Sequence, residues 1–593
     1  MTVLEKLSKL RECMAKRNFD AYIIPTDDFH ASEYVGDYFK SREFMSGFTG
    51  SAGTLVVLKN KAALWTDGRY FLQADSQLKG SSIELMKSGR PSVLTIPQYL
   101  FKNLEEGVTI AFDGRTVSEH FVRQLSHKTN AKKMKFVGDE DLVDIVWTTR
   151  PAISKKKVWE LEVGATRKEK LEKLRGKLEE LKADVFLETS LDNIAYLLNL
   201  RGNDVLYTPV FLSYLLVFKE KAVVFLHKEI ISTEIEEKLL KDGVVLADYH
   251  EITKELSLLE DRTILLDKGI VNFQLVKSLP TNCKQIDRIS PLTLMKAVKN
   301  SEEMENIRKA HIKDGVAVTK FIYWLKHEVG KGNVTELTAS KKLLEFRSKM
   351  EGFLDLSFES IIAYGPHGAI VHYAPTKETD VVMKPCSFCL ADTGGHYKEG
   401  TTDITRTIAL GTLTEEEKKD YTLVLKGHLN LAAAKFIKGV CGSNLDYLAR
   451  SPLWEHGLDF NHGTGHGVGY LLSVHEGPHS IHWNVTRGRR QVPFEEGMIV
   501  SDEPGLYITD KFGIRHENLL LCRNGEKNEY GQFLYFENLT MVPFDKEAID
   551  VSLMTKEELK KLNDYHRQVY QIVSPYLEEK ERIWLQEVTS ELC

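Results

Sequence analysis

The first half of the chain shows the same order of polar and hydrophobic positions twice. A polar, charge-rich stretch ends at Asp20 and is followed by the apolar run 21–24. A second polar stretch ends at Asp184, 164 positions later, and is followed by the apolar run 185–187. Each pattern predicts a helix that leads into a buried strand.

The repeat continues further along the chain. The apolar runs 55–58 and 215–218 are each followed by a short lysine-rich turn and a second apolar run. Both patterns predict two strands joined by a tight polar turn. Helix–strand units often look alike by composition, but the matched order and the nearly constant offset favour a duplication. We therefore predict two α/β domains of one fold, at residues 1–150 and 151–299.

The remaining residues, 300–593, have the pattern of one larger unit. Acidic residues follow Ser301, as in the first turn of a helix that would extend to about His327. A helical tail is predicted from about residue 553, because Thr555 and Glu558 fit a capping box. Its apolar stripe predicts core packing or a dimer contact and comprises Leu559, Leu562, Val569, Ile572 and Val573.

Charge and composition narrow the class of protein. The 593 residues include 79 Lys and Arg against 85 Asp and Glu, a net charge of −6. This near balance excludes a basic nucleic-acid-binding protein and an acidic disordered chain. The first residues lack the apolar stretch of a signal peptide, and no apolar run approaches the ~20 residues that span a bilayer. Seven scattered cysteines favour a reducing compartment. We expect a soluble, cytoplasmic protein without nucleic-acid or membrane partners.

Four acidic residues stand at the ends of predicted strands in the last unit. Asp392 ends an apolar strand, and Asp403 begins a β-branched one after a glycine-containing connection. A hairpin there would bring the two carboxylates together on adjacent strands. Glu503 and Glu517, fourteen positions apart, form a second pair of the same kind. Acids side by side in apolar strands are costly unless a cation neutralises them.

A histidine- and glycine-rich segment, 462–470, lies between the two acidic pairs. Two histidines four positions apart could indicate a helical zinc site, but the four glycines would each destabilise a helix by roughly 1 kcal/mol. In an extended chain His462 and His466 share one face, and the glycines share the other, where neighbouring backbone could approach closely. We therefore predict a strand that carries a histidine ligand.

The donor set indicates the metal. Four carboxylates and one imidazole suit Mn²⁺ best, and also Co²⁺, Fe²⁺ or Zn²⁺. Four negative charges exceed what one divalent ion needs, whereas two ions about 3.5–4 Å apart and bridged by carboxylates would balance them. Cys386 and Cys389 form a lone pair without a second CxxC, so we interpret them as strand residues.

These residues resemble the metal-dependent pita-bread peptidases of family M24. Within it the chain is similar to the long, three-domain, cytosolic aminopeptidase P (Xaa-Pro aminopeptidase) type over nearly its whole length. The motifs that carry the resemblance lie at 46–53, 65–70, 200–204, 462–467, 474–478 and 502–505.

The resemblance implies a site with two metal ions bound by Asp392, Asp403, His466, Glu503 and Glu517. Asp403 and Glu517 would bridge the ions. Glu503 would also take the proton from a bridging hydroxide that attacks the carbonyl carbon before proline.

The resemblance further implies residues that support the reaction. His372 and His475 would hydrogen-bond the tetrahedral intermediate, and His462 would help to form a proline pocket. The residues expected to contact or orient the peptide are Arg69, His372, His462, His466, His475, Glu503, Tyr507 and Arg515.

The implied fold is of the α/β (α+β) class. Two creatinase-like domains with mixed sheets would precede a pita-bread catalytic domain with a curved antiparallel sheet around the metals. The implied activity is hydrolysis of the bond between an N-terminal residue and a penultimate proline, by a homodimer acting on peptides with proline second. The basic stretch 487–490 departs from the family pattern; it predicts a surface loop that could favour acidic peptides.

Two alternatives stay open. A prolidase-type X-Pro dipeptidase uses the same kind of metal site, but prolidases resemble only a two-domain chain. A non-catalytic peptide-binding protein on the same fold is the second alternative, although such relatives typically lose metal ligands.

Overall fold

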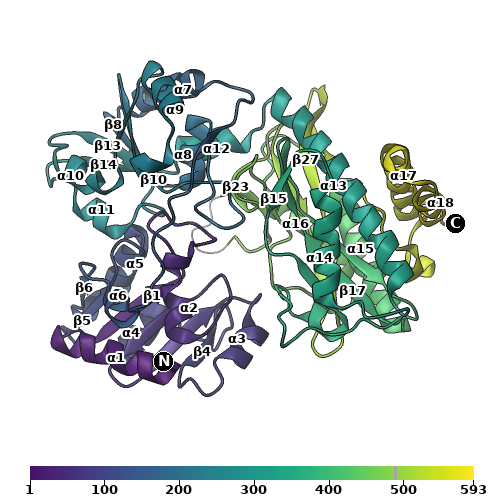
Figure 1. Cartoon of the computed structure of the whole chain (residues 1–593), viewed down its shortest axis with the longest axis horizontal. Helices are drawn as coiled ribbons and strands as arrows, with labels where there is room; N and C mark the ends of the chain where they lie inside the picture. The colour runs from purple at the N-terminus through teal and green to yellow at the C-terminus, as the bar shows by residue number, and fades with distance from the viewer. Residues whose placement is uncertain (486–490) are drawn as a thin grey trace. The chain divides into compact units, whose positions relative to one another are not determined.

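The computed structural model describes residues 1–485 and 491–593 (Figure 1). The basic stretch 487–490 lies outside the described residues. The chain divides into two compact units, Met1–Thr293 and Leu294–Cys593. Within the described residues, no helix combines the length and the apolar character that crossing a bilayer requires.

The first half of the N-terminal unit is built around one six-stranded mixed sheet. Helix α1 (Val3–Lys16) leads into its first strand, as predicted. The sheet has the order β4-β3-β2-β1-β5-β6, with antiparallel β1–β2 and β2–β3 pairs and parallel neighbours on both sides. Its strands are β1 (Ala21–Pro25), β2 (Thr54–Leu58), β3 (Ala62–Thr66), β4 (Glu84–Lys87), β5 (Thr109–Phe112) and β6 (Lys135–Val137).

The second half of this unit repeats that sheet strand for strand. Its order is β12-β11-β10-β8-β13-β14, with the same pattern of parallel and antiparallel neighbours. The duplication predicted from the hydrophobic pattern is therefore confirmed as a repeat of topology. The strands are β8 (Val185–Glu188), β10 (Ser213–Phe218), β11 (Ala222–Leu226), β12 (Val244–Asp248), β13 (Thr263–Leu266) and β14 (Lys284–Asp287).

Helices pack on these two sheets because each presents an apolar face. In α7 (Arg167–Leu181), Thr166 forms the N-terminal capping box, and Leu171, Leu174 and Leu178 are buried. A short pair, β7 (Trp159–Glu160) and β9 (Leu200–Arg201), lies outside the sheets. The other helices are α2 (Ser41–Ser46), α3 (Phe71–Gln77), α4 (Ile96–Asn103), α5 (Glu119–Thr129), α6 (Leu142–Val146), α8 (Leu191–Leu198), α9 (Thr233–Lys241), α10 (Ile252–Ser257) and α11 (Phe273–Lys277), with α12 (Pro291–Ala297) at the junction of the units.

The C-terminal unit pairs all its named strands antiparallel, as predicted. Its hydrogen bonding is divided among four sheets, where the sequence predicts one curved sheet. The orders are β21-β28-β27-β24-β22-β23, β16-β17-β20, β15-β18-β19 and β25-β26. The division arises where short connections, such as the one after β17, turn away to join another sheet.

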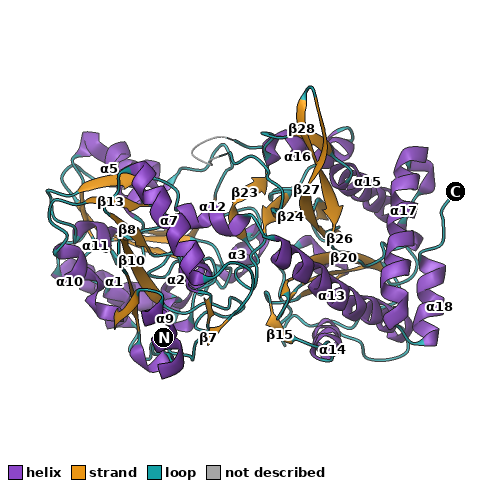
Figure 2. Cartoon of the chain, turned by 90° about the horizontal axis from the view of Figure 1, so that it is seen from above, coloured by secondary structure: helices purple, strands orange, loops and turns teal. Residues whose placement is uncertain are grey.

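The strands of this unit are β15 (Phe353–Leu356), β16 (Ile361–Tyr364), β17 (Phe388–Thr393), β18 (Gly395–Tyr397), β19 (Gly400–Thr401), β20 (Ile404–Ala409), β21 (Lys435–Ile437), β22 (Gly465–Gly467), β23 (Glu476–Ile481), β24 (Ile499–Asp502), β25 (Gly505–Ile508), β26 (Phe512–Arg515), β27 (Asn518–Asn528) and β28 (Gly531–Asn538). Figure 2 shows helices flanking these strands. They are α13 (Ser301–Glu328), α14 (Glu336–Ser348), α15 (Glu415–Ala432), α16 (Gly442–Trp454), α17 (Lys556–Val573) and α18 (Glu579–Val588).

The apolar stripe of the C-terminal tail packs inside its own unit. Leu562, Val569 and Val573 are fully buried in a core shared with α15, and Leu559 and Ile572 pack against the same core. The prediction that the stripe packs in the core is therefore confirmed.

Candidate metal centre

The first acidic pair lies on two adjacent strands of the C-terminal unit. Strands β17 and β20 are antiparallel neighbours, and Asp392 lies opposite Thr405. Asp403 immediately precedes β20, so its carboxylate and that of Asp392 share one end of the strand pair. Both residues are buried, with 9% and 4% exposure. The predicted pairing of the two strands is confirmed.

The second acidic pair occupies an equivalent place on another strand pair. Strands β24 and β27 are antiparallel, and Asp502 lies opposite Asn518. Glu503 follows the first of these residues and Glu517 precedes the second, so they lie at neighbouring strand ends. The Glu517 backbone N–H donates to Thr405 O at 3.1 Å and thereby ties the two acidic pairs together.

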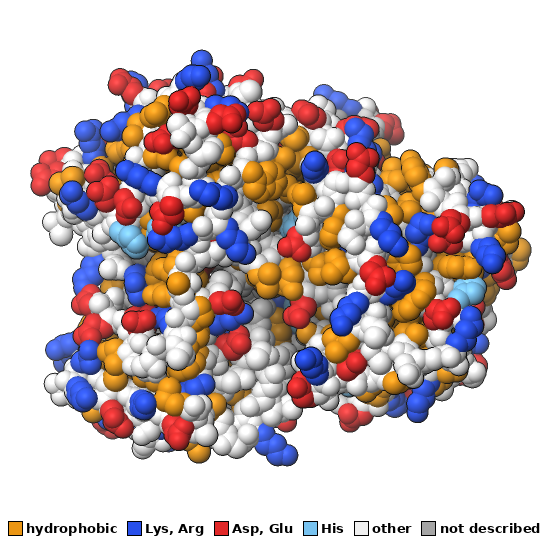
Figure 3. All heavy atoms as spheres, in the orientation of Figure 1, with side chains coloured by type: hydrophobic (Ala, Val, Ile, Leu, Met, Phe, Trp, Pro, Cys, Tyr) orange, Lys and Arg blue, Asp and Glu red, His pale blue; other side chains and the backbone are white. Residues whose placement is uncertain are grey.

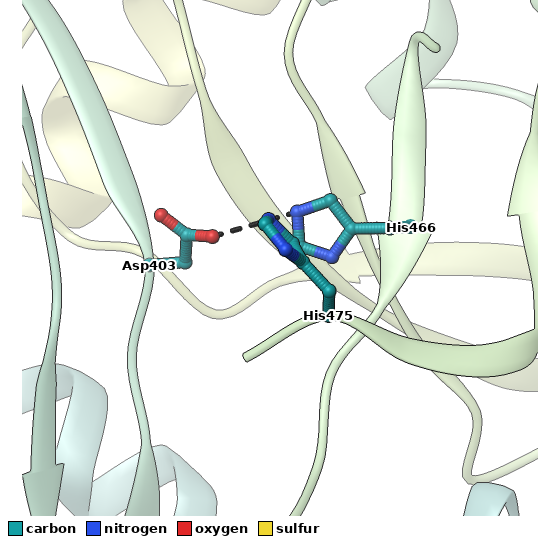
Figure 4. A group of neighbouring side chains, drawn as sticks. All are labelled: Asp403, His466 and His475. Atoms are coloured by element: carbon teal, nitrogen blue, oxygen red, sulfur yellow. Dashed lines mark ion pairs between the residues drawn. The ribbon is translucent and has the colours of Figure 1, made fainter. Parts of the chain in front are cut away.

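His466 lies in strand β22 and faces the carboxylates. Its Nε2 atom is 3.3 Å from Glu503 Oε1 and 3.5 Å from Asp403 Oδ2. Its Nδ1 atom lies 2.9 Å from the Gly467 carbonyl oxygen, which fixes the ring orientation and leaves Nε2 toward the acids. Figure 4 shows Asp403 beside the His466 ring, with the His475 ring next to it.

The alternating glycines have the role that the sequence predicts. A side chain at position 465 would overlap the Ser501 carbonyl oxygen, and one at position 467 would overlap the Glu476 carbonyl oxygen. Because these glycines let strands β24 and β23 approach closely, His466 is held between them. The segment is a strand and not the helix of a helical zinc motif.

Three overlapping groups of side chains could each hold a metal ion. In each group the ligand atoms all lie within 4.8 Å of one another. The groups are Asp392, Asp403 and Glu517; His466, Glu503 and Glu517; and Asp403, His466 and His475. Asp403, His466 and Glu517 each belong to two groups. Of these three, the carboxylates Asp403 and Glu517 have the two oxygens that bridging of two ions requires. His475, expected to contact substrate, is also within reach of a metal.

Unmet hydrogen-bonding capacity shows that the site fits divalent cations. Asp392 Oδ1, Asp403 Oδ1 and Glu517 Oε1 are buried and have no hydrogen-bond partner within residues 1–485 and 491–593. Buried carboxylate oxygens without donors are costly, and a hard divalent cation is the ligand that satisfies several of them at once. The donor set and its unpaired oxygens therefore suit two such ions.

The electrostatics of the site lead to the same conclusion. Burial raises the pKa of Asp392, Glu503 and Glu517, and the neighbouring Asp403 carboxylate raises each further. Burial lowers the pKa of His466, but Asp403 and Glu503 outweigh it and raise this pKa to about 9. Bound cations would reverse this balance, since they favour ionised carboxylates and a neutral imidazole.

Arg515, Tyr507 and His462 form a hydrogen-bonded chain that begins at the acids. Arg515 is buried and donates from Nη2 to Asp392 Oδ2 at 2.5 Å and from Nη1 to the Tyr507 hydroxyl oxygen at 2.6 Å. That hydroxyl lies 2.8 Å from His462 Nε2. Burial raises the pKa of Tyr507 to about 12, so its hydroxyl stays protonated. The structure thus joins three of the predicted supporting residues to one metal-ligand candidate.

The two histidines expected to contact the reacting carbonyl lie on different segments. His475 precedes β23, and its ring centroid is 4.3 Å from that of His466 in an edge-to-face arrangement. His372 follows Val371, whose carbonyl oxygen accepts a hydrogen bond from Arg515 Nη2 at 3.3 Å. Both backbone segments are therefore connected to the cluster of candidate ligands.

Arg69 belongs to the N-terminal unit, between β3 and α3. Its guanidinium donates to both oxygens of Asp67, at 2.9 and 2.8 Å, and lies 3.9 Å from Glu33. Burial lowers the pKa of Arg69, but these carboxylates outweigh it and raise it above its ordinary value. Its predicted contact with bound peptide is carried forward as a proposal.

Two hydroxyl groups that sequence reasoning missed hold the acids in place. Thr405 Oγ1 donates to Glu517 Oε2 at 2.8 Å, and Ser501 Oγ donates to Glu503 Oε1 at 3.0 Å. Each hydroxyl residue lies two positions from an acidic candidate, Asp403 or Glu503, on the same face of its strand. That period-two spacing is the signal that could have found them.

Four segments of the chain match known protein families. Residues 305–524 match metallopeptidase family M24, and residues 532–592 match the C-terminal region of peptidase M24. Residues 6–145 and 149–303 each match a creatinase/prolidase N-terminal domain. Fold and site therefore define a metallopeptidase of the M24 class with two N-terminal domains of one kind.

Full-length relatives narrow the class further. A probable Xaa-Pro aminopeptidase P of Laccaria bicolor is 39% identical over 606 residues, which cover 99% of this chain and 93% of the relative. The crystal structure of X-prolyl aminopeptidase from Caenorhabditis elegans, described as a cytosolic enzyme with a di-nuclear active site, has a TM-score of 0.95 and 36% identity and covers 100% of both chains. The chain belongs to the Xaa-Pro aminopeptidase P family.

The Xaa-Pro dipeptidase from Bacillus anthracis shares only part of the architecture. It has a TM-score of 0.50 and 23% identity, and the match covers 64% of this chain and 99% of that one. At this identity the likeness shows the fold alone. It is consistent with the expectation that prolidases resemble a shorter chain.

Proposed function

We propose that the protein is a dinuclear metallo-aminopeptidase that hydrolyses the bond between the N-terminal residue of a peptide and a penultimate proline. One observation carries the proposal. Overlapping groups of ligand atoms share Asp403 and Glu517 in a chain that aligns with Xaa-Pro aminopeptidases over 99% of its length. All five predicted metal ligands belong to these groups.

We infer that Asp392, Asp403, His466, Glu503 and Glu517 hold the two ions. Bound divalent ions supply acidity to a water molecule and polarise the scissile carbonyl group. The shared positions of Asp403 and Glu517 support a bridging role for both. Manganese is the proposed metal, because hard oxygen donors predominate; Co²⁺, Fe²⁺ and Zn²⁺ also suit the donors.

Glu503 is the proposed general base. Its side chain is 18% exposed, the most accessible of the four carboxylates, and Ser501 holds one of its oxygens. A carboxylate so placed can take the proton from the attacking water. His372 and His475 would then donate hydrogen bonds to the oxygen that gains negative charge.

The proposed proline pocket includes His462. Its link to Tyr507, and from there to Arg515 and Asp392, would couple the position of the pocket to that of the metal ligands. Arg69 is proposed to contact the bound peptide. In that role Arg69→Lys should raise KM without loss of metal. A lysine cannot make the two-pronged contact by which the guanidinium is held on Asp67, so the side chain would no longer be oriented for the peptide.

The proposed assembly is a homodimer in the cytoplasm. Its support no longer includes the C-terminal stripe, which is buried within the chain. It includes the exposed rings of Tyr447, Trp454 and Trp483, whose successive centroids lie 6.0 and 6.4 Å apart. Sedimentation of the full chain tests the dimer. Charged side chains of both signs are interspersed over the face in Figure 3, in keeping with the near-balanced net charge.

We also propose the domain boundaries 1–150, 151–299 and 300–593, with the helical tail from about 553. The separate family matches at 6–145 and 149–303 support the division of the N-terminal unit.

The test is metal removal followed by product analysis. Chelator-treated protein should regain hydrolysis of an X-Pro-Pro peptide with added Mn²⁺, and mass spectrometry should detect release of the first residue. A prolidase would leave this tripeptide intact and cleave only X-Pro dipeptides. A non-catalytic peptide-binding protein would bind the peptide and leave it uncleaved, whichever metal ion is added.

A further inference from the structure

A buried glutamate outside the metal-ligand set lies at the start of helix α14. Glu336 is the first residue of this 13-residue helix and is 0% exposed. The N-terminal end of a helix stabilises a negative charge, and three hydrogen-bond donors surround the Glu336 carboxylate. Glu336 Oε1 accepts from Tyr364 N and from His367 Nδ1, both at 2.8 Å, and Oε2 accepts from the Tyr373 hydroxyl at 2.8 Å.

All three donors belong to the segment that leads to His372. This segment, residues 364–373, begins at the last residue of strand β16 and is named the His372 loop. Tyr364 begins it, His367 is near its middle, and Tyr373 comes directly after His372. One carboxylate therefore holds the loop at three points, including the residue adjacent to the candidate catalytic histidine.

The opposite side of the loop is held by the site itself. Arg515, which donates to Asp392, also donates to the Val371 carbonyl oxygen at 3.3 Å. Gly368 packs directly on the backbone of Gly513, where an added Cβ would lie 2.9 Å from the Gly513 nitrogen. The loop is thus fastened to β26 on one side and to Glu336 on the other.

We propose that Glu336 is a positioning residue for the reaction: it holds the His372 loop so that the histidine can donate to the oxygen that gains charge. This inference rests on the proposed function. The physical reason is that such a donor stabilises a transition state only if it is already in place. Displacement by about 1 Å can cost up to about a hundredfold in rate.

Tyr373→Phe tests the proposal with little change in shape. It removes the hydroxyl that donates to Glu336, which also lies 3.0 Å from Thr379 Oγ1. It keeps the ring, which is packed against buried residues of β16 and β17. We expect kcat to fall about tenfold, the effect of losing about one buried hydrogen bond to a charged group, while KM changes less than about twofold. Metal content should equal that of the wild type.

Tyr364→Phe is the matched control. Tyr364 lies in the same loop, but its hydroxyl contacts Cys386 Sγ at 3.2 Å and not Glu336; only its backbone N–H does. The control should keep kcat within about twofold of the wild type, since no contact to Glu336 is lost. Thermal midpoints of both variants identify any loss of folding.

A double-mutant cycle separates positioning from general loosening. In a His372→Ala background, Tyr373→Phe should lower kcat by less than about twofold, because the donor that it positions is already gone. If Tyr373→Phe fails to fold, His367→Ala and His367→Asn serve instead. The alanine should lower kcat about tenfold, and the asparagine, whose amide nitrogen can replace Nδ1, should restore it.

The outcomes are distinct. Equal effects of Tyr373→Phe with and without His372, loss of metal in the variant, or no difference from the Tyr364→Phe control would overturn the positioning role while leaving the proposed function intact. If the metal-loaded wild type cleaves no X-Pro peptide, the proposed function fails, and the positioning role fails with it.

Discussion

Glu188 in the N-terminal unit and Glu517 in the C-terminal unit are both buried glutamates at the ends of central strands, with 3% and 1% exposure. Burial raises the pKa of both. Their surroundings differ in the number of donors. Within the part of the chain that the structure describes, the Glu517 carboxylate accepts one hydrogen bond, from Thr405 Oγ1, and its Oε1 has no partner. The Glu188 carboxylate accepts four hydrogen bonds. Two come from the backbone N–H groups of Thr189 and Ser190, and two come from Asn193 Nδ2 and Ser290 Oγ.

The difference separates an acid satisfied by the protein itself from an acid that we propose as a metal ligand. At Glu188 four donors replace the lost water, so the charge is compensated by the protein. At Glu517 the nearest groups include other carboxylates, which raise its pKa further. A divalent cation from solution can compensate such a site while the acids stay ionised. Burial alone therefore does not identify a metal-binding acid; the signal at this site is that several carboxylate oxygens without donors lie close together.

The largest expected effect is that of Glu517→Ala. The variant should bind less metal and lose more than about a thousandfold in kcat/KM, because a ligand shared by two ion sites contributes several kcal/mol to transition-state stabilisation. Metal analysis and peptide hydrolysis measured on the same sample check this. Wild-type turnover at wild-type metal content would contradict the assignment of Glu517 as a ligand.

Removal of metal should destabilise the wild type. A ligand that binds only the folded state contributes about 2.7 kcal/mol at a free concentration one hundred times its Kd. The thermal midpoint should fall on chelation and rise again with added Mn²⁺. In Glu517→Ala the thermal midpoint should change much less with metal. An equal change in both proteins would contradict the proposal that Glu517 binds metal.

Glu188→Ala should give the converse result. Four donors would lose their acceptor, so the free energy of unfolding should fall by about 2–3 kcal/mol. Metal content and kcat per folded molecule should match the wild type, as followed by denaturant titration and activity. Loss of metal in this variant would show that buried acids in the two units are not distinct in role.

Thr405→Val has the smallest expected effect of this series. It removes the hydroxyl that donates to Glu517 Oε2. Loss of a residue that orients a metal ligand typically costs 10–100-fold in affinity or activity, so about tenfold is expected in kcat/KM. Thr319→Val is the control, because the Thr319 hydroxyl is also buried in this unit but has no partner among the described residues. The control should remain fully active.

The sequence predicted the repeat and the acidic pairs, because both depend on local patterns. The charge-rich stretches that end at Asp20 and Asp184, each followed by an apolar run, predicted the order of helix and strand, and the topology of the two sheets is the same. The pairing that brings Asp392 to Asp403 followed from the spacing and glycines of the connection. Each of these features could be predicted from residues that are close to one another in the sequence.

Other features depend on long-range geometry and could not be predicted. The division of the last domain into four sheets depends on which strand pairs with which across the unit. Glu336 had no local signal, since its donors lie about thirty or more positions away. The C-terminal stripe was ambiguous because its apolar pattern is the same for a core and for a dimer contact.

The count of bound metal ions is the most direct test of the central claim. Metal-free protein titrated with Mn²⁺ and measured by native mass spectrometry should take up two ions per chain, with cleavage of an X-Pro-Pro peptide appearing as they bind. Saturation at a single ion with full turnover, or hydrolysis at full rate without any bound ion, would contradict the account.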